Sequence, residues 1–169
     1  MYPIRKRFLV GVVLGLIILW VGYNLLASEI AQRDNREAFA RVQHPQGTSL
    51  VDSLNMKIEY YPATYADDSI RFKSAYLVGE LRRYTGSWDG IQTFYGNEKV
   101  KDDIPIMLMP IEFHTIGQRI SLDAVDGIVF DPFAYDVLSA VQDHYRFWGA
   151  PQSLNEAEKN LYLIYGVWQ

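Results

Sequence analysis

Hydrophobic residues are unevenly distributed along this chain of 169 residues, and the longest apolar run lies near its start. Residues 8–27 include no charged side chain, and a basic tail at 1–7 precedes them. A helix rises about 1.5 Å per residue, so this run spans about 30 Å, the thickness of the hydrocarbon core of a bilayer. The pattern therefore predicts a single-pass transmembrane helix at 8–27.

A basic segment followed by an apolar run is also typical of a secretory signal peptide. The run at 8–27 is longer than the apolar core of such a signal, which has about 7–15 residues. Its end, Leu25-Leu26-Ala27, carries a leucine where cleavage prefers a small residue. An uncleaved signal-anchor is therefore the favoured interpretation, and a cleaved signal is the alternative.

The orientation of the span is predicted from the basic residues on either side of it. A basic triplet at 5–7 directly precedes the span, while three arginines at 33–41 are interleaved with acidic residues. Basic residues close to a span tend to stay cytoplasmic. The two sides carry equal counts, so the proximity of the triplet decides the prediction. We expect a protein of the plasma (inner) membrane with a cytoplasmic N-terminus and an extracytoplasmic C-terminal domain.

Two glycines inside the span, Gly11 and Gly15, form a G-x-x-x-G pair. Glycines at this spacing share one helix face and let two transmembrane helices approach closely. The alternative interpretation is that glycine is simply common in membrane helices. The pair predicts a homodimer contact through the transmembrane helix.

The residues after the span divide into a stalk and a domain. Residues 28–42 contain neither Gly nor Pro and are rich in helix formers, so the helix is expected to continue as a short stalk. With the linker that follows, the stalk occupies 28–48. The remaining residues, 49–169, are enough for one compact domain with its own core.

The first half of this domain shows both strand and helix periodicity. Alternating apolar and polar residues at 54–60 predict a half-buried strand that Pro62 ends. A helix is predicted over 67–85, although residues 70–76 also suit a second strand. A shorter helix is predicted over 87–95.

The second half begins with an apolar segment at 104–109 that contains Pro105 and is followed by Pro110. Because proline cannot donate a ladder hydrogen bond, this segment is predicted to lie at a sheet edge. Alternation at 111–114 and 119–122 predicts a hairpin, with Gly117-Gln118 as a type II′ turn. The remaining predicted elements are a turn at Asp126-Gly127, a strand at 128–130, a helix over 132–148, and a last helix opened by Ser153 and Glu156 that runs to Trp168.

Together these elements predict an α+β fold: one N-terminal transmembrane helix, then a small domain with an antiparallel sheet and about three to four helices. Composition then excludes several functions. Without the basic triplet at 5–7, 13 Lys and Arg stand against 20 Asp and Glu, a net charge of −7. Such a domain does not suit nucleic-acid phosphates. The absence of cysteine excludes disulfides, thiolate metal ligands and a cysteine nucleophile.

The predicted hairpin brings polar side chains together on one face. Its register places Glu112 opposite Asp123, with His114 two residues along the strand. Two carboxylates and an imidazole suit a divalent metal ion. The alternative interpretation is the solvated outer face of an amphipathic sheet, where the same residue types are common.

The other two histidines have simpler interpretations. His44 lies in the linker, and His144 is predicted to be a hydrogen-bonded histidine of the core, on the apolar face of the helix over 132–148. Among the many aromatic residues, Tyr61, Tyr65 and Phe147 fall off the predicted apolar faces. They are therefore the predicted contact residues for a partner, because aromatic side chains are favoured at interfaces.

No signature of a known catalytic class is present: the sequence contains no G-x-S-x-G, no H-E-x-x-H, no Walker A motif and no G-x-G-x-x-G. The favoured hypothesis is a membrane-anchored, non-enzymatic interaction or assembly module without a cofactor, such as an accessory subunit of an envelope complex. Its expected partners are the lipid bilayer and a membrane or envelope protein. The alternative is a membrane-tethered metal-dependent or glycan-acting hydrolase that uses the acidic and histidine face of the hairpin.

Overall fold

The computed structural model describes residues 3–60, 73–96, 99–101, 104–117, 119–125 and 132–168. The chain forms two compact units, Met1–Glu37 and Ala38–Gln169, which are described separately. The predicted turn at Asp126-Gly127 and the predicted strand at 128–130 lie outside the described residues.

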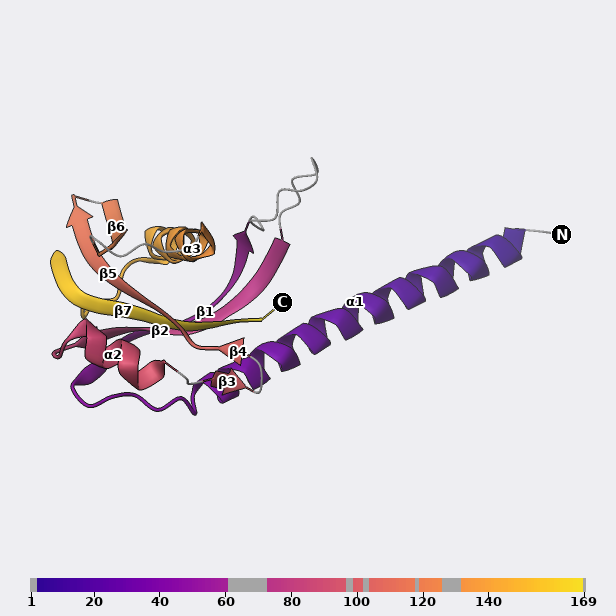
Figure 1. The fold of residues 1–169 in the computed structure, drawn as a ribbon. Coiled ribbons are helices and arrows are strands. Elements are labelled where there is room, and N and C mark those ends of the chain that lie inside the picture. The colour runs from indigo at the N-terminus through magenta and orange to yellow at the C-terminus, as the bar shows by residue number, and fades with distance from the viewer. Residues whose placement is uncertain are drawn as a thin grey trace. The chain divides into compact units, whose positions relative to one another are not determined.

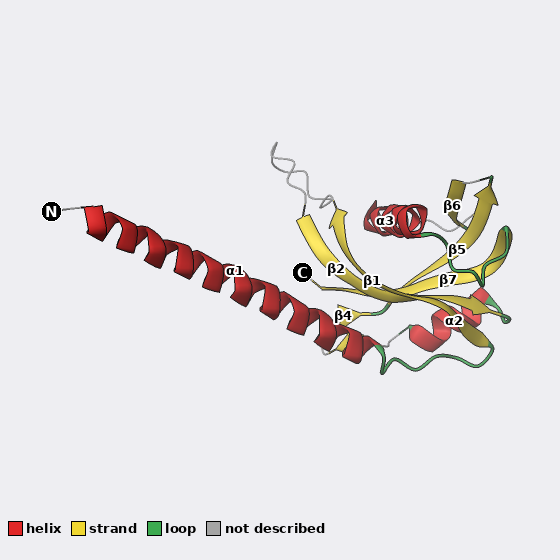
Figure 2. Cartoon of the chain, turned by 180° about the vertical axis from the view of Figure 1, so that it is seen from behind, coloured by secondary structure: helices red, strands yellow, loops and turns green. Residues whose placement is uncertain are grey.

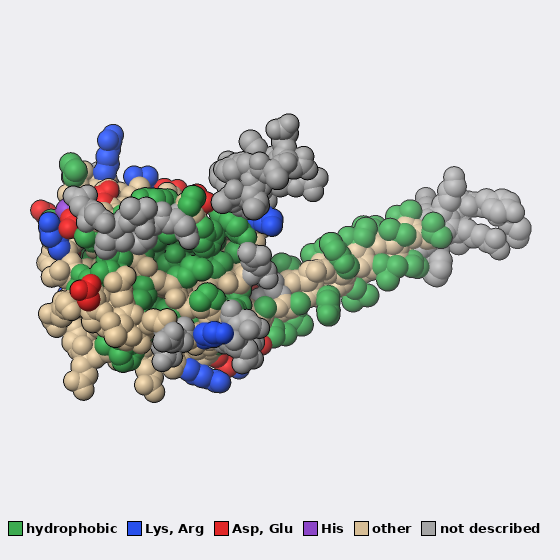
Figure 3. All heavy atoms as spheres, viewed as in Figure 1, with side chains coloured by type: hydrophobic (Ala, Val, Ile, Leu, Met, Phe, Trp, Pro, Cys, Tyr) green, Lys and Arg blue, Asp and Glu red, His purple; other side chains and the backbone are tan. Residues whose placement is uncertain are grey.

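The first unit is formed by one helix, α1 (Pro3–Phe39), whose last two residues belong to the second unit. Hydrophobic side chains follow one another along its described part (Figure 3), and no residue of its most apolar stretch is buried. Among the described residues it is the one helix long and apolar enough to cross a bilayer, although a signal sequence would meet the same criteria. The helix continues without a break past the predicted span, as the composition of the stalk predicted.

The second unit is built on a curled antiparallel sheet of five strands (Figure 1). Their order is β1 (Thr48–Tyr60), β2 (Lys73–Tyr84), β7 (Ala157–Trp168), β5 (Met107–Ile116) and β6 (Arg119–Ala124). The last strand in the chain therefore lies in the middle of the sheet, between two hairpins that come before it.

The sheet is covered on both faces (Figure 2). Helix α3 (Pro132–Trp148) lies in the hollow of the sheet, on what we call the inner face. Helix α2 (Trp88–Tyr95) lies on the opposite, outer face. A small ladder of β3 (Lys99–Lys101) and β4 (Ile104–Pro105) completes the described elements.

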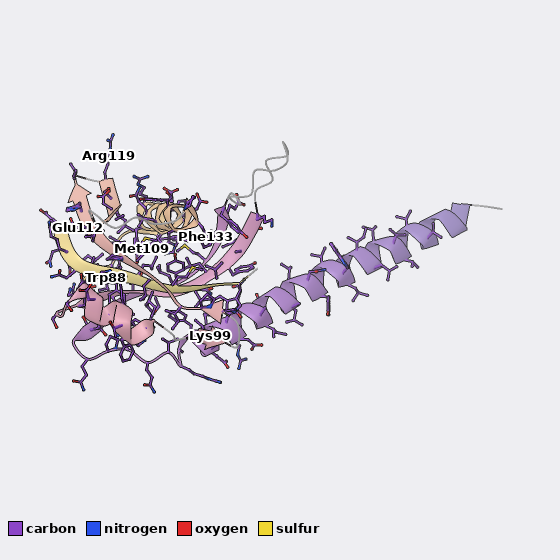
Figure 4. The ribbon with its side chains drawn as sticks, in the orientation of Figure 1. Trp88, Lys99, Met109, Glu112, Arg119 and Phe133 are labelled. Atoms are coloured by element: carbon purple, nitrogen blue, oxygen red, sulfur yellow. The ribbon has the colours of Figure 1, made fainter. Side chains whose placement is uncertain are left out.

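Two hydrophobic clusters result from this layering. The inner cluster packs α3 against the sheet and includes Met109 and Phe133, which Figure 4 labels. The outer cluster joins α2 to the sheet and includes Phe39, from the end of α1, together with Tyr162 and Ile164 of β7. Strand β7 thus contributes to both clusters.

The predicted last helix was wrong, because these residues form the central strand β7. Leu161 to Tyr165 are five consecutive residues that are each 2 % exposed or less. A strand covered on both faces shows a continuous apolar run instead of alternation. A continuous apolar run contains apolar residues at every spacing, including the helical one, and this is why the segment resembled a helix face.

The helix predicted over 67–85 was also wrong over 73–84, where the chain forms β2. The alternative strand at 70–76 was closer, although residues 67–72 lie outside the described part. Leu77 and Leu81 pack in the inner cluster, and Val78 packs in the outer one. Burial on both faces again hides the strand period.

The edge position predicted for the segment 104–109 is confirmed. Ile104–Pro105 form β4 in a two-stranded ladder, and in the described part of the chain Met107–Pro110 pair with β7 alone. The β5–β6 ladder ends at the pair Ile111 and Ala124. The carbonyl of Pro110 accepts a hydrogen bond from Val125 N at 3.4 Å. Because the N–H and C=O of a strand residue point the same way, proline removes only a donor that would lie beyond this ladder.

Several predictions are confirmed. The alternation at 54–60 continues through β1, where Leu54, Ile58 and Tyr60 are buried. The hairpin has the predicted register, with Ile116 opposite Arg119. Short helix α2 lies where it was predicted and begins after Ser87, whose side chain caps Gly90 N at 3.2 Å.

Helix α3 has the predicted bounds, but its buried face is displaced from the predicted one. Its buried residues are Ala134, Val137, Leu138, Val141 and Tyr145. His144, which was predicted in the core, is only half-buried and lies edge-on to Tyr145. The predicted core residue Trp148 is 73 % exposed. The helix ends at Gly149, which adopts a φ of +91°.

Side chains of α3 also close the edge of the sheet at β6. Gln142 Oε1 accepts a hydrogen bond from Leu122 N at 2.9 Å, and Arg146 Nε donates to the carbonyl of Ile120 at 3.3 Å. An open edge strand invites pairing with another chain. These two contacts satisfy backbone groups of β6 that would otherwise offer such a template.

Candidate functional site

The three predicted metal ligands all lie on the outer face of the hairpin, but only two of them are in contact with each other. Glu112 lies opposite Asp123, and His114 Nε2 is 3.4 Å from Glu112 Oε2. The third predicted ligand, Asp123, has a different partner: Ser121 Oγ donates a hydrogen bond to Asp123 Oδ2 at 3.1 Å. In the described part of the chain, no group of three His, Asp or Glu side chains is arranged to hold a metal ion. Metal at this face therefore stays a prediction, and the metal content of a His114→Ala variant tests it.

A cation relieves the repulsion between the two facing carboxylates. Lys159 Nζ lies 3.4 Å from Glu112 Oε1 (Glu112 is labelled in Figure 4). The register between β5 and β7 shifts at this point, where Ile111 pairs with Leu161 but Phe113 pairs with Glu158. The bulge leaves Asn160 at a φ of 61° and places Lys159 beside Glu112. The pairing of Glu112 with Lys159 fits the solvated-face interpretation.

Of the three predicted contact residues, the structure describes only Phe147. Tyr61 and Tyr65 lie outside the described residues. Phe147 is 78 % exposed, and its ring meets that of Trp148 edge-on with centroids 4.8 Å apart. We call Phe147 and Trp148 the aromatic end of α3. The sequence predicted the first member and assigned the second to the core.

Gly11 and Gly15 lie in α1, and a Cβ atom built on either would meet no atom within 4 Å. The helix surface around the pair is therefore open. The structure does not test pairing of two such helices, so the homodimer contact stays a prediction.

A second polar constellation, on the outer face, was not predicted. His44 follows the end of α1 and contacts two elements of the domain. Its Nδ1 is 2.7 Å from the Tyr95 hydroxyl of α2, and its Nε2 is 3.3 Å from Glu80 Oε2 of β2. The Tyr95 hydroxyl is in turn 3.4 Å from the Tyr162 hydroxyl of β7. A neutral imidazole that donates from Nε2 and accepts at Nδ1 satisfies both of its contacts.

Arg82 completes this constellation, which we call the His44 network. Its guanidinium donates to Glu80 Oε2, the same oxygen that His44 approaches. A second nitrogen is 3.4 Å from Thr48 Oγ1, which donates to the carbonyl of Pro45 at 2.9 Å. Arg82 is only 8 % exposed, and its Nε has no hydrogen-bond partner among the residues that the structure describes. Glu80 therefore carries most of the compensation for a buried charge.

Burial shapes the protonation states in this network. Removal from water lowers the pKa of His44, the positive charge of Arg82 lowers it further, and Glu80 opposes the shift. Burial likewise raises the pKa of the Tyr95 hydroxyl, with a smaller contribution from its hydrogen bond to Tyr162. At neutral pH both His44 and Tyr95 are therefore uncharged.

The chemistry open to this network is limited by access. A general acid or base must come within hydrogen-bond reach of its substrate. Tyr95 is 2 % exposed and Tyr162 is fully buried, and each hydroxyl already contacts the other. The arrangement therefore suits a structural attachment of the segment around His44 to β2 and α2.

Comparison of the chain with known proteins gives no match to a family model, to a curated protein or to a solved structure. The function is therefore argued from the described residues alone. Sequence reasoning missed the His44 network because His44, Glu80, Tyr95 and Tyr162 come from four separate segments. The one local signal is the spacing of Glu80 and Arg82, which an alternating strand places on one face.

Proposed function

We propose that this protein is a membrane-anchored, non-enzymatic interaction module. Helix α1 would hold the domain at the plasma (inner) membrane, with the N-terminus cytoplasmic and the domain extracytoplasmic. The domain would serve as an accessory subunit of an envelope complex. Support for the anchor comes from the length and exposed apolar surface of α1.

The observation that carries the proposal is the aromatic end of α3. Phe147 and Trp148 are 78 % and 73 % exposed. Many of the other aromatic side chains are packed in the two hydrophobic clusters. Exposing two adjacent large rings to water is unfavourable unless a partner covers them. Aromatic residues with this exposure are favoured contact residues of protein interfaces.

The surroundings of the aromatic end extend the apolar surface. The hydrogen bond from Arg146 to the carbonyl of Ile120 places the last turn of α3 beside the start of β6. Ile120 pairs with Thr115, so the tip of the hairpin lies at this end of the domain. That tip carries Ile116, which is 77 % exposed. We propose a protein partner that covers the aromatic end and the hairpin tip.

Photo-crosslinking in the native membrane tests this surface. A photoreactive amino acid at position 147 or 148 of the full-length chain is expected to capture one protein. Gln92 is the matched control, because it lies exposed on α2, on the outer face. Adducts with lipid alone, or the same adduct from position 92, would contradict the proposal.

An alanine substitution gives an independent measurement. Trp148→Ala is expected to weaken partner binding by about 2 kcal/mol, roughly 30-fold, if Trp148 is a central contact. The exposed side chain makes few contacts in the domain, so unfolding should change by less than about 0.5 kcal/mol. An unchanged affinity in quantitative co-purification would remove Trp148 from the interface.

The orientation has its own test. Reporter fusions after Gln169 are expected to be active only when the reporter works outside the cytoplasm. Activity of a cytoplasmic reporter at this position would reverse the proposed topology while leaving the aromatic end as a docking surface.

A further inference from the structure

The segment that joins α1 to β1, residues 40–47, is fixed to the sheet near both of its ends. At its start, Phe39 is 2 % exposed in the outer cluster, and Val42 packs against the same cluster. At its end, the carbonyl of Gly47 accepts hydrogen bonds from Thr85 N and Thr85 Oγ1, each at 3.1 Å. Between these points, the attachment is polar: His44 contacts Tyr95 and Glu80, and Thr48 Oγ1 donates to the carbonyl of Pro45.

Groups from every neighbouring element face the His44 ring. Strand β2 contributes Glu80 and Arg82, α2 contributes the Tyr95 hydroxyl, and Tyr162 of β7 lies behind Tyr95. Thr48 of β1 contacts Arg82 from the other side. Glu80 is the one carboxylate in this group, and Arg82 already occupies the oxygen that His44 approaches.

A proton added to His44 would disturb both of its contacts. The protonated ring would be a second positive charge beside Arg82. Both charges would then share one oxygen, Glu80 Oε2. Its Nδ1 would become a donor, so the Tyr95 hydroxyl would lose its acceptor 2.7 Å away. Tyr95 could then donate only toward Tyr162, whose hydroxyl is farther away, at 3.4 Å.

We propose that His44 is an acid-sensitive latch, which holds the segment 40–47 on the sheet when neutral and releases it when protonated. Among the described contacts, the released segment keeps the apolar contacts of Phe39 and Val42, the hydrogen bond from Thr48 to the carbonyl of Pro45, and the Gly47–Thr85 hydrogen bonds. Acid would thus loosen the attachment of the segment 40–47 to the sheet. The inference does not depend on the aromatic end having a partner.

The direction of the pH effect follows from the lowered pKa of His44 in the fold. The released segment binds a proton more readily, with the ordinary pKa of 6.5, than the latched one does. The attachment therefore has its full strength above about pH 6.5 and weakens as the pH falls below that value. It weakens by up to about tenfold for each unit by which the latched pKa lies below 6.5.

Hydrogen exchange of the full-length chain in lipid nanodiscs measures the latch. Protection factors, which correct for the intrinsic pH dependence of exchange, are compared at about pH 7.5 and about pH 5. We expect a loss of protection at residues 40–48 in acid, with β7 unchanged. Equal protection at the two pH values would overturn the latch.

His44→Gln is the decisive variant, because glutamine can accept from Tyr95 and donate to Glu80 but does not titrate. Its protection at 40–48 is expected to be independent of pH. His114→Gln is the matched control, since His114 pairs with Glu112 on the hairpin, and it should keep the pH dependence. A His44→Gln variant that keeps the acid response would contradict the proposal.

The His44→Gln variant could leave the segment 40–47 detached at every pH. A measurement on the unaltered chain covers this case. The chain has three histidines, so exchange of the ring C2 hydrogen reports His44 separately from the other two after digestion. A pKa of His44 clearly below 6.5 is expected. A value at or above 6.5 would overturn the latch, whatever the variant does.

Discussion

Replacing Gly79 with alanine is expected to destabilise the domain by about 1–3 kcal/mol or more. A Cβ atom at Gly79 would meet the backbone oxygen of Ile164 at 2.5 Å and Tyr165 Cβ at 2.8 Å. Gly79 pairs with Tyr165 in the centre of the sheet, so neither neighbour can move without distorting the β2–β7 ladder. Chemical denaturation of the purified full-length chain, followed by circular dichroism, measures the loss.

The matched control is Gly86→Ala, because a Cβ atom there meets nothing within 4 Å. Its unfolding free energy should stay within about 0.5 kcal/mol of the unaltered chain. If the two variants were equally stable, the close approach of β2 and β7 at Gly79 would be refuted.

Removing the carboxylate of Glu80 is expected to cost about 3–5 kcal/mol of unfolding free energy. Glu80→Ala leaves the buried guanidinium of Arg82 without the charge that compensates it. Within the described part of the chain, Arg82 Nε already lacks a partner. The same change removes the acceptor of His44. The measurement is again chemical denaturation of the full-length chain.

Two comparisons isolate the effect of the buried charge. Glu59→Ala breaks the exposed pair with Lys57, whose atoms are 3.8 Å apart, and should cost less than about 1 kcal/mol. Arg82→Met combined with Glu80→Ala removes both buried charges and is expected to be more stable than Glu80→Ala alone. A double variant less stable than the single one would show that the lost charge balance is not the main cost.

Local patterns predicted the elements whose signals lie within a few residues. The uncharged run of α1, the cap of α2 at Ser87 and the alternation around Gly117 each depend on near neighbours. The hairpin register was predictable because a short turn fixes which residues face each other. Its register holds for Glu112 and Asp123 as predicted.

The central strands were not predictable in the same way. In β7 and β2, burial on both faces removes the alternation that identifies a half-buried strand. Residues such as Leu161 and Ile164 then match a helix face as well as a strand. Only the partners of these strands, which are distant in the chain, decide between the two structures.

The candidate site residues show the same contrast between local sequence signals and contacts of distant segments. Phe147 was predicted as a contact residue because it falls off the apolar stripe of α3, and it is exposed. Trp148 was misplaced because the prediction grouped it with His144, whereas the helix buries the next residue, Tyr145, and leaves Trp148 exposed. The role of His44 depends on Glu80 and Tyr95, and no local pattern connects these residues.

The position of β7 also has a consequence for biosynthesis. The hairpins β1–β2 and β5–β6 do not pair with each other, and β7 pairs with one strand of each. The ribosome makes β7 after the other strands that the structure describes, so until then each hairpin presents an unpaired inner edge. We expect the nascent domain to depend on chaperones until residues 157–168 emerge. Chains interrupted before that point should be rapidly degraded.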